Sequence, residues 1–292
     1  MSQQPPLPIV RSIAELRQAV RVWRNQGETV GLVPTMGALH DGHLALVTAA
    51  KQACDRAVAT IFVNPKQFDR KDDLESYPRT EAQDSALLAE RHCDLLFAPP
   101  GSEIYPPDFA TKVSVSVASL TDSLDALHRP GHFDGVTTVV SKLLMQALPD
   151  KAFFGEKDYQ QLSIVTRMVV DLNIPVEIVP VGTVRQTDGL ALASRNAHLT
   201  PAQREVAPLL FATMQAIATR LAQDPSQPAE PLLVEGRHRL GQGGFAKVDY
   251  LDLRAADDLS ALSHASRPAR VFAAAWLGDT RLIDNVPVER LT

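Results

Sequence analysis

The stretch that decides the fold runs from Val30 to His43 and reads VGLVPTMGALHDGH. Residues 30–33 form a short apolar run that ends at Pro34, which is typical of a strand buried on both faces. A loop of small residues follows, and residues 42–53 then predict a helix. A strand, a small-residue loop and a helix N-terminus together favour phosphate binding, through backbone N–H groups and the helix dipole.

This loop carries two histidines, His40 and His43, with Gly42 between them. At this spacing both imidazoles can face the same anion, while the glycine lets the chain approach closely. The alternative is a glycine-containing turn with two surface histidines, since short patterns recur by accident. The position of the motif, directly after the first strand of an α/β pattern, favours the phosphate site. The sequence has no GxxxxGK[ST] string, so a P-loop ATPase is not supported.

The segments around this loop alternate between strand and helix patterns. We expect strands at 57–63, 95–98, 113–117, 152–154 and 176–181, and helices from a Ser12–Glu15 capping box and at 81–91, 134–148 and 158–172. Apolar strands separated by amphipathic helices predict a doubly wound, Rossmann-like parallel sheet over residues 1–184. Ligands of such sheets bind beyond the carboxyl ends of the strands, at a topological switch point.

Residues 185–292 show a different pattern and predict a smaller α+β domain. Thr200, Pro201 and Gln203 have the arrangement of a capped helix start, and we expect one long helix there. Strands are expected near 248–253 and 271–276. The chain therefore predicts two domains.

Composition excludes several classes of protein. The chain has 292 residues, of which 45% are hydrophobic and 22% charged, and its net charge is 29 − 34 = −5. An acidic chain does not favour nucleic-acid binding, and the longest apolar run, 271–277, is far shorter than the ~20 residues of a membrane span. Cys54 and Cys93 form no CxxC motif, and residues 1–6 resemble no secretory signal. We therefore expect a cytoplasmic protein that binds neither nucleic acid nor membrane.

Two later loops carry charged residues after apolar runs. Residues 154–158, FGEKD, lie between a predicted strand and a helix, and Lys157 there offers a cation. Residues 192–196, LASRN, contain Arg195, whose guanidinium can clamp a phosphate, beside Ser194 as a further donor. Taken alone, the first loop is more often only a solvated turn, and the second is more often a turn whose arginine pairs with a nearby acid.

Two segments suggest the acceptor side of a site. Gln67 follows the second strand, and its neutral amide can hold both a hydroxyl and a carboxylate. Residues 129–135, RPGHFDG, form a loop bounded by Pro and Gly before a helix, either a mobile lid or only a turn.

Together these segments closely resemble the pantothenate synthetase (pantoate–β-alanine ligase) family, within the HxGH nucleotidyltransferase superfamily. The matching strings, in the family's order over almost the full length, are PTMGALHDGH (34–43), IFVNPKQF (61–68), YPRT (77–80), RPGHFDGV (129–136), FGEKDYQQL (154–162), LASRN (192–196) and AAWLGDTRLIDN (274–285).

The resemblance implies an ATP-dependent condensation of pantoate with β-alanine through a pantoyl-adenylate, yielding pantothenate, AMP and pyrophosphate. It also implies Mg²⁺ as cofactor and a homodimer. His43, with His40, Lys157 and Arg195, takes the catalytic positions, while Gln67 binds pantoate and β-alanine and Gln161 binds pantoate. The residues placed around ATP are Met36, Gly37, Ala38, Leu39, His40, Asp41, Gly42, His43, Gly155, Glu156, Lys157, Asp158, Val184, Leu192, Ala193, Ser194 and Arg195.

Within this reading, Asp84 is the candidate for the metal, and a solvated acid on a helix surface is the alternative. The smaller domain is expected to act as a lid that keeps water from the adenylate. The chain departs from the family at Lys66, where Met is usual, and at Ala193, where Ser is common. The direction of the Lys66 side chain is an open question.

Two other functions compete with the ligase. A related transferase acting on a phosphorylated acceptor needs extra cations, whereas the acceptor side here offers Gln67 and Gln161. A non-catalytic nucleotide-binding module is expected to lose His43 or Lys157, and both are present. The ligase is therefore the favoured interpretation.

Overall fold

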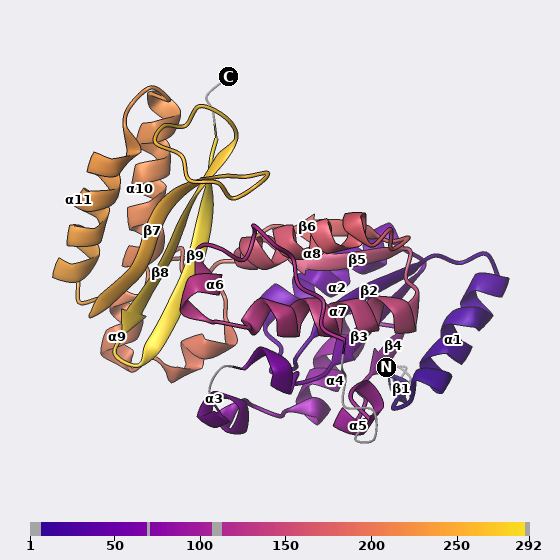
Figure 1. Ribbon diagram of the computed structural model, residues 1–292. Coiled ribbons are helices and arrows are strands. Elements are labelled where there is room, and N and C mark those ends of the chain that lie inside the picture. Colours follow the sequence, from indigo (N-terminus) through magenta and orange to yellow (C-terminus); the bar gives the residue numbers. More distant parts are fainter. Residues whose placement is uncertain (1–6, 69–70, 107–112, 290–292) are drawn as a thin grey trace. The chain divides into compact units, whose positions relative to one another are not determined.

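The computed structural model describes residues 7–68, 71–106 and 113–289, and the chain divides into two compact units, which we describe separately (Figure 1). The first unit covers residues 1–119, 129–156 and 164–182. The second unit covers residues 120–128, 157–163 and 183–292, so two short segments that precede residue 183 belong to it.

The first unit is built on a parallel sheet of six strands, counted over the described residues, in the order β1-β4-β3-β2-β5-β6. The strands are β1 (Ile9–Val10), β2 (Val30–Thr35), β3 (Arg56–Ile61), β4 (Leu95–Phe97), β5 (Lys151–Gly155) and β6 (Glu177–Val181). From β2 the chain builds outward through β3 and β4, and then returns to place β5 on the other side of β2. The strand order therefore reverses at β2, and the loop after β2 lies where open α/β sheets bind ligands.

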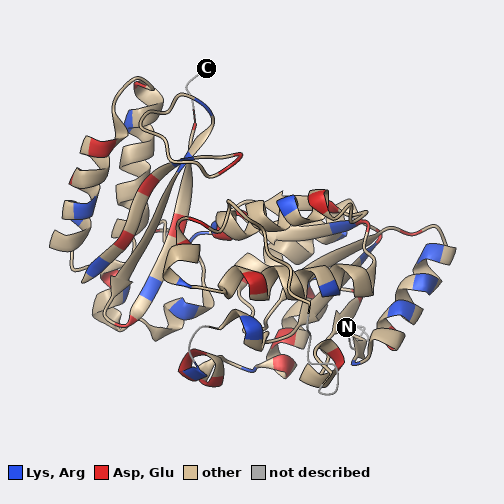
Figure 2. Ribbon diagram, in the orientation of Figure 1, with Lys and Arg blue, Asp and Glu red and all other residues tan. Residues whose placement is uncertain are grey.

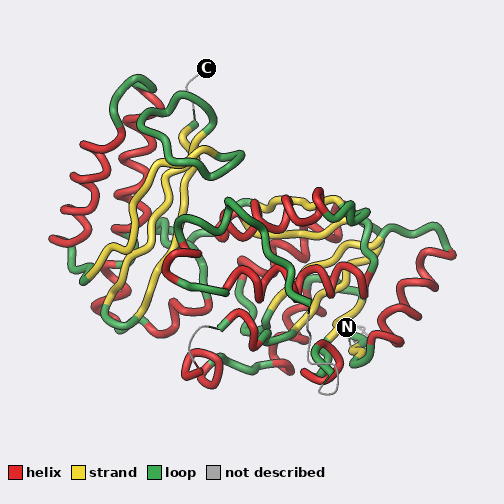
Figure 3. The backbone as a smooth tube through the Cα atoms, viewed as in Figure 1, coloured by secondary structure: helices red, strands yellow, loops and turns green. Residues whose placement is uncertain are grey.

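Helices of the first unit follow most of these strands (Figure 3). They are α1 (Ile13–Asn25), α2 (Asp41–Ala53), α3 (Lys71–Ser76), α4 (Glu81–Glu90), α5 (Gly101–Ile104), α7 (His132–Ala147) and the greater part of α8 (Tyr159–Asp171), with a 3₁₀ turn η1 (Pro65–Gln67). The predicted capping box at Ser12 and Glu15 starts α1. The Rossmann-like prediction for this unit is confirmed.

Helices α2 and α4 cover one face of this sheet. Val47 of α2 and Leu88 of α4 pack with Val33, Leu96 and Phe153 of the strands in one apolar cluster, and each of these side chains is at most 1% exposed. The burial of apolar area holds the end of β2 and the start of α2 in place. The HxGH loop therefore connects two elements that are fixed by the core.

The predicted strand at 113–117 is wrong, because this segment is irregular. Its alternating sequence, VSVSV, fits a strand, but the backbone of Val115 pairs with a helix instead. The Val115 N–H donates to Thr138 Oγ1 at 3.1 Å, and the Val115 carbonyl accepts from Thr137 Oγ1. Two threonine hydroxyls of α7 thus replace the neighbouring strand that a ladder requires.

The second unit has an antiparallel sheet of three strands in the described chain, in the order β7-β8-β9. The strands are β7 (Lys247–Ala255), β8 (Ala269–Leu277) and β9 (Thr280–Val288). Its helical segments are α6 (Asp125–His128), the first turn of α8 (Tyr159–Asp171), η4 (Ser194–His198), α9 (Pro201–Val206), α10 (Leu209–Gln223) and α11 (Ala229–Gln242), and η3 (Glu156–Asp158) lies at the boundary between the units. The α+β prediction is confirmed.

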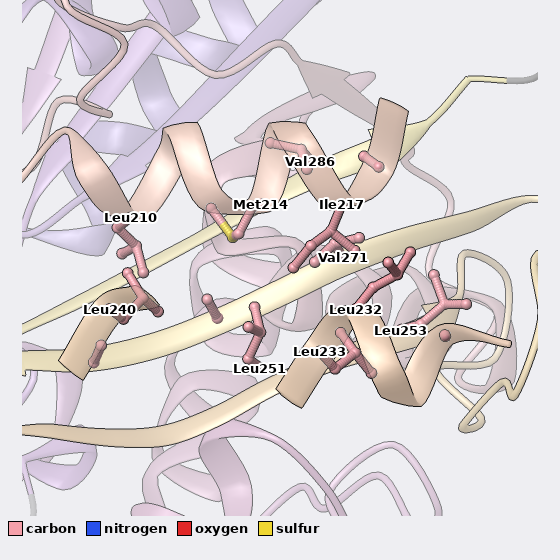
Figure 4. Packing of buried hydrophobic residues seen from close by; sticks show 14 of the residues in the cluster. Leu210, Met214, Ile217, Leu232, Leu233, Leu240, Leu251, Leu253, Val271 and Val286 are labelled. Carbon is pink, nitrogen blue, oxygen red and sulfur yellow. The ribbon is translucent and has the colours of Figure 1, made fainter. Parts of the chain in front are cut away.

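One face of this sheet packs against α10 and α11 (Figure 4). Met214 and Ile217 of α10 meet Leu232 of α11, Leu251 of β7 and Val271 of β8 in a buried cluster. The expected single helix after Thr200 is instead two, α9 and α10, with Pro208 between them. The capping box at Thr200 and Gln203 is present.

Charged side chains are interspersed along the elements of both units (Figure 2). Among the helices that the structure describes, none combines the length and the apolar character needed to cross a bilayer.

Candidate active site

The loop after β2 has an unusual backbone. Gly37 has φ +83° and Ala38 has φ +52°, so two successive residues are left-handed. This conformation is easily adopted by glycine but costs energy for alanine, so neighbouring groups must hold it. The first such group is Thr35 at the end of β2, whose Oγ1 accepts from the Gly37 N–H at 3.2 Å.

Asp84 of α4 holds the rest of this loop. Its two carboxylate oxygens accept from the N–H groups of Ala38 and Leu39, each at 2.9 Å, and from the Thr80 hydroxyl at 3.1 Å. Asp84 is only 1% exposed, so the alternative of a solvated surface acid is wrong. A buried carboxylate that accepts two backbone N–H groups fixes the path of the chain between β2 and α2.

The two histidines begin α2 as an unusual capping pair. His40 is the N-cap residue, and its Nδ1 accepts from the Gly42 N–H at 3.1 Å. The Nδ1 of His43 in turn accepts from the His40 N–H at 3.4 Å, and the ring centroids lie 4.1 Å apart. A neutral imidazole that accepts at Nδ1 carries its proton on Nε2. In this tautomer each ring keeps an Nε2–H donor, and both rings lie at the N-terminus of α2, the positive end of the helix dipole.

Gln67 lies in η1, beyond the carboxyl end of β3, and its amide is oriented by Asn64. Asn64 Nδ2 donates to Gln67 Oε1 at 3.0 Å and to the Gly135 carbonyl at 3.0 Å, and Asn64 is only 1% exposed. The Tyr105 hydroxyl donates to Asn64 Oδ1 at 2.9 Å. Burial raises the pKa of Tyr105 to about 12, so its hydroxyl stays a donor at neutral pH. With its oxygen engaged by Asn64, Gln67 can offer the two hydrogens of its amide nitrogen to a substrate.

The RPGHFDG loop packs on the backbone of Gln67. His132 Nδ1 and Arg129 Nη2 lie 2.7 and 3.3 Å from the Gln67 carbonyl oxygen. Gly135 brings α7 against η1, since a Cβ at this position would lie 2.2 Å from the Lys66 carbonyl oxygen. The loop is therefore more than a turn, because it contacts the segment that precedes α3. The loop supports the segment that carries Gln67.

The direction of the Lys66 side chain is also resolved. Its Nζ lies 5.0 Å from the centroid of the Tyr105 ring, within the range of a cation–π contact. Lys142 Nζ lies 5.9 Å from the same ring. Lys66 therefore stacks its cation on the tyrosine that donates to Asn64.

The second unit holds another set of the predicted residues. The Leu192 N–H donates to the Val184 carbonyl at 3.0 Å, and the two residues form the base of a hairpin that turns at Gly189. Ala193, Ser194 and Arg195 follow directly as the start of η4. Val184 and Leu192–Arg195, separated in the sequence, are therefore neighbours in one small substructure.

Lys157 and Gln161 lie in segment 157–163, one of the two short segments of the second unit that precede residue 183. Lys157 Nζ lies 3.7 Å from Asp158 Oδ1, and the Lys157 side chain is 19% exposed. Gln161 is half-buried in α8. Its neighbour Gln160 is a structural residue, because its amide donates to the Leu120 and Ser123 carbonyls, each at 2.9 Å, and accepts from the Asp125 N–H at 3.0 Å.

The predicted site residues thus form two groups, one in each unit. The first unit holds Met36–His43, Gln67, Asp84, Gly155 and Glu156, and the second holds Lys157, Asp158, Gln161, Val184 and Leu192–Arg195. The sequence did not reveal the residues that hold Gln67 in place, which include Asn64, Tyr105 and His132. The strings NPKQF and RPGHFDG contain two of the three, but only the fold shows what they contact.

The described residues contain no group of three or more His, Cys, Asp or Glu side chains that could hold a metal ion. Both oxygens of Asp84 already accept hydrogen bonds. The donor set around Asp84 therefore does not fit a dedicated Mg²⁺ site, and its hydrogen bonds favour a role in holding the loop. Mg²⁺ in nucleotide sites is commonly held by phosphates and water rather than by an all-protein cage.

Comparison with known proteins shows which protein family the chain is similar to. A sequence model described as "Pantoate-beta-alanine ligase" matches residues 8–287. The pantothenate synthetases of Roseobacter denitrificans and Ruegeria pomeroyi are 55% and 52% identical over 97% of this chain and 98% of their own lengths.

Solved structures agree with the sequence relatives. The crystal structure of pantothenate synthetase from Thermus thermophilus has a TM-score of 0.89 and 46% identity, covering 97% of this chain and 99% of that one. A pantoate–β-alanine ligase from Francisella tularensis, complexed with "Beta-gamma ATP and Beta-alanine", has a TM-score of 0.81 and 33% identity, covering 97% and 98%. On its sequence, its fold and its site motifs, the chain belongs to the pantoate–β-alanine ligase family.

Proposed function

We propose that this ligase activates pantoate with ATP at the β2–α2 loop and then transfers the pantoyl group to β-alanine. A carboxylate is a poor electrophile because its leaving group would be an oxide. A pantoate carboxylate oxygen attacks the α-phosphorus and pyrophosphate leaves, which gives pantoyl-adenylate. The β-alanine nitrogen, as a neutral amine, then attacks the acyl carbon, the C–O bond to AMP breaks, and the amine loses a proton. The products are pantothenate, AMP and pyrophosphate.

The observation that carries this proposal is the pair of Nδ1-bonded imidazoles at the N-terminus of α2. His40 and His43 each accept a backbone N–H at Nδ1. Their Nε2–H groups are therefore the donors for phosphate oxygens on which charge develops as pyrophosphate departs. Because backbone amides orient the rings before substrate binds, the site needs little reorganisation in the transition state.

The remaining roles follow from the chemistry of the two groups of residues. Gln67, oriented by Asn64, is proposed to bind pantoate and β-alanine, and Gln161 is proposed to bind pantoate. Lys157, Ser194 and Arg195 are proposed to hold the triphosphate, through a point charge, a hydroxyl and a planar fork of donors. The nucleotide substrate is proposed to be Mg-ATP, with the ion carried by the phosphates.

Three further properties are proposed from the family resemblance. The chain is proposed to act in the cytoplasm, in keeping with two buried, free cysteines, and as a homodimer, which sedimentation would test. Its second unit is proposed to act as a lid that excludes water from the adenylate. X-ray scattering profiles that stay unchanged on adding ATP and pantoate would count against closure.

The test of function is pyrophosphate release from Mg-ATP and pantoate, with and without β-alanine, with identification of the nucleotide product. We expect sustained turnover only with both substrates and AMP as product. His43→Ala should lower the rate of adenylation about 10²-fold or more, whereas loss of its capping hydrogen bond should lower the unfolding free energy by only about 1 kcal/mol. Production of ADP would contradict attack at the α-phosphorus, and near-normal turnover of His43→Ala would remove His43 from the catalytic role.

A further inference from the structure

The DTRLIDN segment of β9 ends in two adjacent buried polar residues that the proposed chemistry does not use. Asp284 is 6% exposed and Asn285 is 2% exposed. Burying such groups is costly unless they form good hydrogen bonds. Successive residues of a strand point to opposite faces of the sheet, so these two side chains act on different sides of β9.

Asn285 holds the segment that contains Lys157. Its Nδ2 donates to the Lys157 carbonyl at 2.9 Å, and its Oδ1 accepts from Arg270 Nε at 2.7 Å. The Arg270 guanidinium in turn lies 4.1 Å from the centroid of the Tyr159 ring. The turn from residue 157 to residue 159 is therefore held to the sheet at both ends, by an amide and by a stacked cation.

Asp284 holds the hairpin that contains Val184. Its oxygens accept from Arg185 Nη1 and Nη2 at 2.6 and 2.9 Å, which is a bidentate ion pair. Arg185 also donates to the Gly189 carbonyl at 3.1 Å, across the hairpin turn. Its guanidinium lies 4.1 Å from the centroid of the Phe211 ring. Residue 185 directly follows Val184, so this clamp sets the position of the hairpin relative to β9.

Two neighbouring residues of one strand thus anchor two segments that are far apart in the sequence. Both segments belong to the second unit, and both carry residues of the proposed ATP site. The contacts run through the backbone carbonyl of Lys157 and through the residue after Val184, and not through the Lys157 side chain.

We propose that Asp284 and Asn285 are positioning residues for ATP, which set the Lys157 turn and the Val184 hairpin in the relative placement that binds the nucleotide. This inference rests on the proposed nucleotide-binding role of Lys157 and of the Val184–Arg195 segment. The DTRLIDN segment is then part of the nucleotide-binding apparatus of the second unit, in addition to its part in the sheet.

The test compares Asn285→Asp with two reference variants of the full-length protein. Asn285→Asp keeps the size of the side chain and its acceptor for Arg270, but places an oxygen opposite the Lys157 carbonyl where the donor had been. Lys157→Ala reports the direct role of the ammonium. Val286→Ala, the next residue of β9, loosens the apolar cluster on the helix face and controls for loss of stability.

We expect Asn285→Asp to raise the KM for ATP about tenfold, the effect of losing one well-placed hydrogen bond. The KM for β-alanine should stay within about twofold, because Gln67, the residue proposed to bind it, lies in the other unit. In a Lys157→Ala background, adding Asn285→Asp should change the KM for ATP much less, because the group that it positions is gone. Val286→Ala should lower the melting temperature and leave the KM for ATP unchanged.

Two kinds of result would overturn the inference, and they distinguish a wrong positioning role from a wrong nucleotide site. If Lys157→Ala raises the KM for ATP but Asn285→Asp does not, or if Val286→Ala raises it as much as Asn285→Asp, the positioning role is wrong while the ATP site stands. If Lys157→Ala itself leaves the KM for ATP unchanged, the nucleotide role of Lys157 is wrong, and the positioning role fails with it.

Discussion

Replacement of Asp84 by asparagine tests how the HxGH loop is held. The carboxylate receives the N–H groups of Ala38 and Leu39 on different oxygens, each at 2.9 Å. Asparagine has a single oxygen and a donor NH₂ group in place of the second. In either orientation of the amide, at least one backbone N–H of the loop would therefore face another donor.

The size of the effect follows from these contacts. A hydrogen bond to a charged acceptor contributes about 1.5–3 kcal/mol, and a stranded buried donor costs about 1–3 kcal/mol. Because Asp84 is 1% exposed, water cannot replace the lost acceptor. We expect the unfolding free energy to fall by about 2–4 kcal/mol, a large part of the roughly 5–15 kcal/mol typical of a domain. A small shift of the loop moves both imidazoles, so kcat/KM should fall about 10²-fold.

The assay is urea unfolding together with pyrophosphate release at several Mg²⁺ concentrations. Asp41→Asn is the matched control, because Asp41 is an exposed acid of the same loop whose carboxylate lies 3.7 Å from Arg91. Surface pairs of this kind contribute at most about 1 kcal/mol, so this variant should unfold near the wild-type urea concentration. Wild-type stability of Asp84→Asn, with activity restored by raised Mg²⁺, would refute the positioning role and assign Asp84 to the metal.

Three further changes have defined outcomes. Gln67→Ala should raise the KM for pantoate about tenfold and spare the KM for ATP, because it removes an amide donor only on the acceptor side; an unchanged pantoate dependence would contradict that placement. Gly135→Ala should lower the unfolding free energy by more than about 3 kcal/mol, since the new Cβ would lie 2.2 Å from a backbone carbonyl oxygen of η1, and calorimetry at wild-type stability would exclude that close contact. Burial opposes ionisation of Asp249, but hydrogen bonds from Lys247 and Arg281 outweigh it and lower the pKa to about 2, from the ordinary 3.8. Its stabilisation is therefore complete above about pH 4 and is lost as the pH falls to about 2, so Asp249→Asn should cost about 2 kcal/mol at pH 7 and much less at pH 2, as measured by urea unfolding at both pH values.

The errors of the sequence prediction have physical causes. The segment 113–117 alternates like a strand, but threonine hydroxyls of α7 take its hydrogen bonds. Strand β9 was missed because its apolar pattern is broken by buried polar residues, and Asp284 is one of them. A charged residue inside a strand is tolerated here only because Arg185, 99 residues away in the chain, pairs with it. No local pattern contains that partner.

The local sequence was sufficient for features that depend on neighbouring residues. Periods of two and of 3.6 residues reveal buried strands and amphipathic helices, and capping boxes mark where helices begin. The HxGH string could be interpreted for the same reason, because the strand, the loop and the helix N-terminus that it needs are contiguous. The α/β class, the smaller α+β unit and the candidate loops could therefore all be predicted from the sequence.

The tertiary structure alone decided which distant groups satisfy one another. Asp84 accepts a hydrogen bond from the N–H of Ala38, which lies 46 residues earlier in the chain. Asn285 donates one to the carbonyl of Lys157, which lies 128 residues earlier. Such pairings arise because a buried polar group must find a partner wherever the packed chain brings one, and not at a fixed spacing along the sequence. The sequence by itself thus determined the elements and the reactive side chains, and only the packing of those elements determined which residues hold them in place.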